Sequence, residues 1–68
     1  MNVIELCQTT ASIQLSNDEL ALLNNALNEI CHGIDLAGEF STRIGCEKQE
    51  AEQLLQQIHR LMEDMKKK

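Results

Sequence analysis

The chain has 68 residues, eleven of them acidic and six basic, and its formal net charge is −5 at pH 7. This length allows one domain at most, and so small a core is often supported by a metal, a disulfide or a second subunit. The acidic balance disfavours binding to phosphate backbones and anionic membranes, which depends on lysine and arginine.

The first predicted segment, residues 1–15, has an extended pattern. Val3, Ile4 and Leu6 form an apolar run, a turn is expected near Thr9, and residues 11–15 alternate apolar with polar. This alternation predicts a half-buried strand, alone or in a short hairpin. Because an isolated hairpin is only marginally stable, it would need to lie on the helices or pair with another subunit.

The clearest helix start in the sequence is at Ser16. Its hydroxyl suits an N-cap, and Glu19, three residues later, completes a capping box. We therefore predict a helix over residues 16–32, ended by Gly33. Its apolar face follows spacings of three and four residues and consists of Leu20, Leu23, Leu27, Ile30, Cys31 and Ile34.

Three asparagines, Asn24, Asn25 and Asn28, lie close together in this helix. Asparagine is disfavoured in helices by several tenths of a kcal/mol relative to alanine. Residues that oppose the local structure often serve a function, so we take these three as candidate interaction residues. A solvated face without a function is the alternative.

The connection over residues 35–44 has two interpretations. A short helix capped by Asp35 would align the apolar side chains of Leu36, Phe40 and Ile44 on one face. The alternative is a loop followed by a short extended piece. We favour the helix.

A second amphipathic helix is predicted from Glu47 to Met65, after Gly45, which permits a turn with positive φ. Its apolar face consists of Ala51, Leu54, Leu55, Ile58, Leu61, Met62 and Met65. The basic tail at 66–68 suits the negative end of this helix. The predicted fold is thus mainly α, with a helical domain over 16–65 in which a short helical connection joins two amphipathic helices.

Residues 39–55 weakly resemble a helix-turn-helix, in which glycine opens a turn between two closely crossing helices. The residues that fit the pattern are Phe40, Ser41, Gly45, Cys46 and Ala51. The resemblance implies DNA contacts from Arg43, Lys48 and Gln49 at the start of the second helix. The neighbouring exposed residues are mostly acidic, so we expect nucleic-acid binding to be disfavoured.

The residue types that carry chemistry are scattered along the chain. Candidate metal ligands are Cys7, Cys31, His32, Cys46 and His59. They form no Cys-x-x-Cys or His-x-x-x-His pair, and the histidines that could activate the Cys46 thiol are remote from it in sequence. We therefore predict no cofactor, no metal site and no enzymatic activity.

Cellular location can also be inferred from the sequence. It shows no secretory signal pattern, no apolar run near the roughly 20 residues of a membrane span, and an odd number of cysteines. We expect a cytoplasmic protein with free thiols and no membrane contact.

The segments LALLNNALNEI (20–30) and FSTRIG (40–45), followed by a Glu/Gln-rich helix, resemble small uncharacterised bacterial proteins. This resemblance covers residues 20–55 and implies one compact bacterial domain, and it adds no catalytic residues to the candidates above.

Some apolar residues would remain on the surface of a folded monomer, namely Leu22, Met62 and Met65, together with part of the N-terminal segment. Exposed apolar patches mark interfaces, and a symmetric dimer would cover them. We predict a non-enzymatic interaction or regulatory domain that forms a homodimer and can meet a further protein partner. A helix-turn-helix DNA-binding regulator is the alternative.

Overall fold

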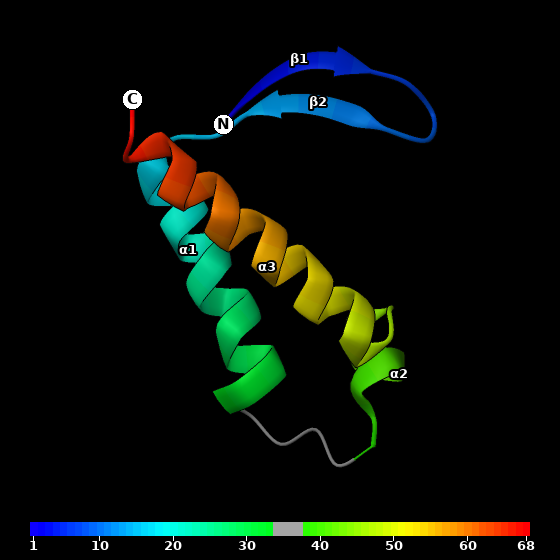
Figure 1. Cartoon of the computed structure of the whole chain (residues 1–68). Helices are drawn as coiled ribbons and strands as arrows, with labels where there is room; N and C mark the ends of the chain where they lie inside the picture. Colours follow the sequence, from blue (N-terminus) through cyan, green and yellow to red (C-terminus); the bar gives the residue numbers. More distant parts are fainter. Residues whose placement is uncertain (34–37) are drawn as a thin grey trace.

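The computed structural model of the chain describes residues 1–33 and 38–68. In these ranges a two-stranded hairpin precedes a mainly helical body, as the sequence predicts (Figure 1). The elements are β1 (Asn2–Leu6), β2 (Ala11–Gln14), α1 (Asn17–Asn28), a π-helical turn (Glu29–Gly33), α2 (Phe40–Ile44) and α3 (Lys48–Met65).

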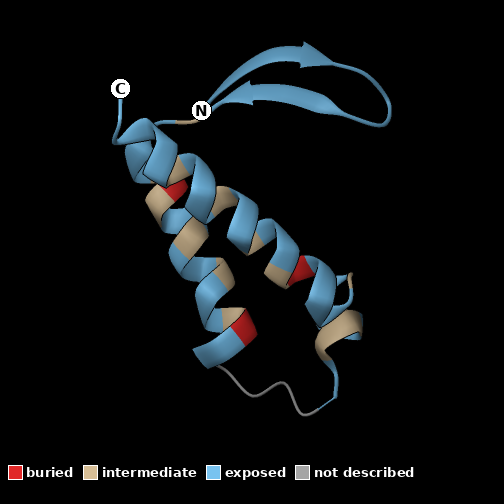
Figure 2. Ribbon diagram, viewed as in Figure 1, coloured by how far each residue is buried: buried red, intermediate tan, exposed pale blue. Residues whose placement is uncertain are grey.

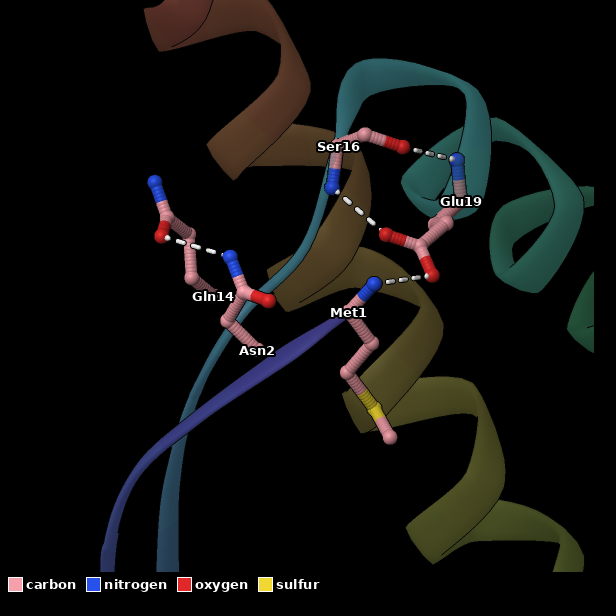
Figure 3. A network of polar contacts seen from close by, with 5 residues as sticks. All are labelled: Met1, Asn2, Gln14, Ser16 and Glu19. Atoms are coloured by element: carbon pink, nitrogen blue, oxygen red, sulfur yellow. Dashed lines mark hydrogen bonds and ion pairs between the residues drawn. The ribbon is translucent and has the colours of Figure 1, made fainter.

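The start of α1 is held by the predicted capping box. The Glu19 backbone N–H donates to Ser16 Oγ at 3.1 Å, and the Ser16 backbone N–H donates to Glu19 Oε1 at 2.9 Å. The N-terminal ammonium group of Met1 lies 2.8 Å from the other carboxylate oxygen of Glu19 (Figure 3). One carboxylate therefore joins the base of the hairpin to the first turn of α1.

The hairpin is antiparallel and carries a bulge in its first strand. The pairs are Asn2 with Gln14, Val3 with Ile13, Glu5 with Ser12, and Leu6 with Ala11. Ile4 is the extra, unpaired residue between Val3 and Glu5. Paired residues share a face of the ribbon, and alternate residues of one strand share a face. Val3 and Leu6 therefore lie on one face only because Ile4 shifts the register.

The bulge sorts the hairpin side chains into two faces by polarity. We call one the hairpin apolar face; it consists of Val3, Leu6, Ala11 and Ile13. The opposite face carries Asn2, Glu5, Ser12 and Gln14, and the side chains of Asn2 and Gln14 are 3.5 Å apart. Every residue of both strands is exposed, so the predicted half-burial is wrong, because the main contacts of each strand are with the other strand.

The helical body is one layer formed by α1 and α3, which run in opposite directions side by side (Figure 1). Its fully buried side chains, among the described residues, are Leu20, Cys31 and Ala51 (Figure 2). Half-buried apolar side chains extend this seam, namely Leu27, Ile30, Leu55, Ile58 and Met62. The chain measures 38 × 31 × 16 Å, so the molecule is flat and has a narrow core.

The connection before α3 contains a short helix, α2, but it is shorter than predicted: its N-cap is Glu39, and Gly38 before it has a positive φ of 86°, which is incompatible with a continuous helix from Asp35. The final residue of α2 is followed by Gly45 at φ 93°, whose N–H donates to the Ser41 carbonyl at 2.9 Å. This left-handed conformation favours glycine, as expected from the sequence. The predicted cap at Asp35 and the positions of Ile34 and Leu36 fall outside the described residues.

The sequence prediction overestimated how much of each apolar face is buried. Leu23 on α1 and Leu54 and Leu61 on α3 belong to the predicted apolar faces but are 41%, 49% and 49% exposed. Each helix has a single helical neighbour of comparable length among the described elements, and one neighbour covers a stripe narrower than these wide apolar faces.

The Glu19 network predicts a specific dependence of stability on pH. Hydrogen bonds from the Met1 ammonium group and the Ser16 backbone lower the pKa of Glu19 in the folded chain. The ionised Glu19 therefore stabilises the folded chain. This stabilisation is present above the ordinary glutamate pKa of about 4.3 and is lost as the pH falls through the lower pKa of Glu19 in the folded state. Glu19→Gln should keep the capping box, lose the ion pair, and lower the urea midpoint at neutral pH but not in strong acid.

Asp18→Asn is the matched control for this change. It removes a negative charge from the same turn of α1 and leaves the network of Met1, Ser16 and Glu19 intact. We expect a smaller change in midpoint. Equal changes in the urea midpoint for Asp18→Asn and Glu19→Gln at every pH would contradict this prediction. They would show that the negative charge stabilises the chain only through the helix dipole and not through the network of Met1, Ser16 and Glu19.

Candidate interaction surfaces

The α1–α3 layer has two sides of opposite character. Residues on a helix are about 100° apart. On α1, Leu20 and Leu27 face α3, with Asn24 and Asn28 toward one flank and Leu23 on the other. On α3 the same geometry places His59 and Glu63 on one flank and Leu54, Leu61 and Met65 on the other. Because the helices are antiparallel, like flanks lie on the same side of the layer.

The polar side holds a groove of about 760 Å³ between the two helices. We call it the polar groove. Its lining residues are Asn24, Asn28, Leu55, Gln56, His59, Arg60, Glu63, Asp64 and Lys67. Two of the three asparagines singled out in the sequence thus lie together in one groove, whereas Asn25 is exposed outside it.

Asn24 is the unusual member of this groove. Its Oδ1 atom is buried without a hydrogen-bond partner among the described residues. A buried acceptor without a hydrogen bond lowers the stability of the fold. The charged side chains of the groove do not carry this cost, because they are exposed to water. Glu63 lies 4.0 Å from His59 and 3.4 Å from Lys66, and all three side chains are more than half exposed, so these ion pairs add little stability.

The opposite side of the layer is apolar and open. We call it the helical apolar face; its exposed members are Leu23, Leu54, Leu61 and Met65. Sequence reasoning proposed Leu22, Met62 and Met65 as residual apolar surface. Leu22 is 69% exposed but points away from α3, Met62 is half-buried, and Met65 belongs to this face. The sequence did not predict that Leu54 and Leu61 are exposed, because residues of a core and residues of an interface follow the same spacing along a helix.

The residues of the helix-turn-helix interpretation are exposed around the turn between α2 and α3. Arg43 belongs to α2, and Lys48 and Gln49 begin α3. Glu47 precedes them as the N-cap residue, and its backbone N–H donates to Glu50 Oε1 at 3.4 Å. Two carboxylates therefore flank the residues that would meet a phosphate backbone, and DNA binding stays a prediction that these charges oppose.

The three thiols lie in different environments and are all free. Burial, and secondarily the charge of Glu52, raises the pKa of the Cys31 thiol. Cys7 lies at the exposed hairpin turn, 2.9 Å from Thr10 Oγ1, and hydrogen bonds from Thr10 and Thr9 lower its pKa to about 7. Among the described residues no three His, Cys, Asp or Glu side chains converge on one metal position.

Comparison with known proteins gives no relative: no family model, curated protein or solved structure matches the chain. Among the described residues, no helix has the length and apolar character that crossing a bilayer requires.

Replacing Asn24 tests the buried amide directly. Asn24→Leu removes an unsatisfied acceptor from the α1–α3 seam, and Asn25→Leu makes the same change at the exposed neighbouring position. We expect Asn24→Leu to raise the free energy of unfolding by about 1 kcal/mol more than Asn25→Leu does, as measured by urea denaturation. Equal changes in the free energy of unfolding for the two variants would contradict this prediction. They would mean that the substitutions act only through helix propensity and that the Asn24 side chain already has a hydrogen-bond partner.

The hairpin turn predicts a reactive thiol. The rate of Cys7 alkylation by iodoacetamide should rise with pH and reach half its maximum near pH 7, because the thiolate is the nucleophile. Thr10→Val removes the main hydrogen bond and should move this midpoint to higher pH. Mass spectrometry of peptides separates Cys7 from the protected Cys31, and an unchanged midpoint in Thr10→Val would contradict the assignment.

Proposed function

We propose that this chain is a non-enzymatic protein-interaction domain that acts as a homodimer joined through the helical apolar face. The observation that carries the proposal is the excess surface of the single chain. A compact protein of this mass would expose about 4,300 Å², whereas this chain exposes 5657 Å². The excess, about 1,300 Å², is larger than the roughly 800 Å² that each partner buries in a standard interface.

The layer architecture supports the same proposal. Stable domains pack at least two layers of secondary structure around a core, and α1 and α3 provide one. The radius of gyration is 13.6 Å, against about 11 Å for a compact domain of this length. A second copy supplies the missing layer, and two-fold symmetry places Leu54 and Leu61 of each copy at the interface.

The acidic charge of the chain indicates which further partner the dimer would bind. Residues 1–65 carry all eleven acidic side chains against Arg43, Lys48 and Arg60, which favours a basic protein surface over a nucleic acid. Dimerisation through the helical apolar face leaves the polar groove open on the other side of the layer for such a partner. The proposal places the protein in the cytoplasm, where its three free thiols stay reduced.

Light scattering after size-exclusion chromatography tests self-association. At tens of micromolar the chain should elute with twice its mass of 7.7 kDa. Leu61→Glu places a charge in the centre of the proposed interface and should raise the dimer Kd by at least about tenfold.

Gln53→Glu is the control for this experiment, because it adds the same charge to α3 on an exposed position away from the helical apolar face. It should leave the dimer intact. A monomeric wild-type chain under these conditions would contradict the proposal, and so would equal weakening of the dimer by Leu61→Glu and Gln53→Glu.

A further inference from the structure

The hairpin apolar face is the second large apolar surface that this chain leaves uncovered. Val3, Leu6 and Ile13 are 56%, 71% and 43% exposed. The bulge at Ile4 gathers these side chains on one side of the ribbon, although their spacing along β1 would otherwise separate them. An isolated two-stranded hairpin is marginal in water and becomes stable when its apolar face packs on a helix or on more strands.

The base of the hairpin is anchored at the N-terminal end of α1 and directs the strands away from the chain's own helices. Only Leu15 and Ser16 separate β2 from α1, and Ser16 is engaged as the helix cap. The ion pair between Met1 and Glu19 holds the other strand at the same point (Figure 3). From this anchor both strands extend as a free arm (Figure 1).

The helical apolar face matches this arm in length and charge. The five residues of β1 span about 17 Å at strand rise. The members of this face on α3 are Leu54, Leu61 and Met65, and they span about 16 Å at helical rise. Glu5 is the one charged side chain in residues 2–15, and it lies on the polar face of the hairpin, so no charge is buried when the two apolar faces meet.

We propose that the hairpin is an exchanged arm: the hairpin apolar face of each copy packs on the helical apolar face of the other copy. This inference rests on the homodimer proposed above and assigns its geometry. Two-fold symmetry makes the exchange reciprocal, so that one dimer covers both hairpins and both helical layers. Each half is then a sheet packed on a helical layer, which is the second layer that a single chain lacks.

The deciding experiment is isotope-filtered NMR on a dimer mixed from labelled and unlabelled wild-type chains. Filtered nuclear Overhauser effects report only contacts between copies. We expect them between the methyl groups of Val3, Leu6 or Ile13 and those of Leu54, Leu61 or Met65. Hairpin-to-helix effects that appear only without the filter would overturn the exchange, because the arm would then cover its own helices.

Two other outcomes would also overturn the exchange while leaving the dimer in place. Filtered effects confined to helix–helix pairs would mean that the layers meet directly, and effects confined to hairpin–hairpin pairs would mean that strand edges join the copies. A monomeric mass by light scattering would instead remove the homodimer itself, so the two proposals fail in distinguishable ways.

A pair of variants provides an independent readout by sedimentation equilibrium. Ile13→Thr keeps a β-branched residue in β2 but places a hydroxyl on the hairpin apolar face, and should raise the dimer Kd by about tenfold or more. Ser12→Thr adds a β-branched residue at the adjacent position on the polar face and should leave the Kd unchanged. Equal dimer Kd values for the two variants would contradict the arm.

Discussion

Two helices packed side by side bury only the stripes that they turn toward each other, and this limit governs the rest of the structure. α1 and α3 are wide amphipathic helices, yet the seam that they form with the π-helical turn contains few buried side chains, which among the described residues are Leu20, Cys31 and Ala51. The apolar side chains beyond this seam, such as Leu54 and Leu61, remain in solvent. Because a domain needs a second layer, we propose that this helix patterning leads to self-association.

The hairpin shows the same imbalance in another form. Its bulge at Ile4 gathers apolar side chains on one face, and the carboxylate of Glu19 ties its base to the start of α1. Local interactions thus fix where the hairpin begins and which face is apolar. They do not determine what that face covers. We propose that it covers the helical apolar face of a second copy, which matches it in length.

Local signals explain which features could be predicted from the sequence. The Ser16 capping box and the positive φ of Gly45 depend on neighbouring residues alone, and both were predicted correctly. The exposure of Leu54 was not, because a spacing of three and four residues is the same for a core as for an interface. The unsatisfied Asn24 amide was visible in the sequence only as an unusual residue type, since its burial depends on where α3 lies.

We propose that one chain is an incomplete fold that a second copy completes. Urea denaturation of the wild-type chain at two concentrations a hundredfold apart tests this most directly. If the copies fold together, the apparent free energy of unfolding rises by about 2.7 kcal/mol, RT times ln 100, and the midpoint moves to higher urea. Superimposable curves at the two concentrations would contradict the homodimer, because the single chain would then be stable without a second copy.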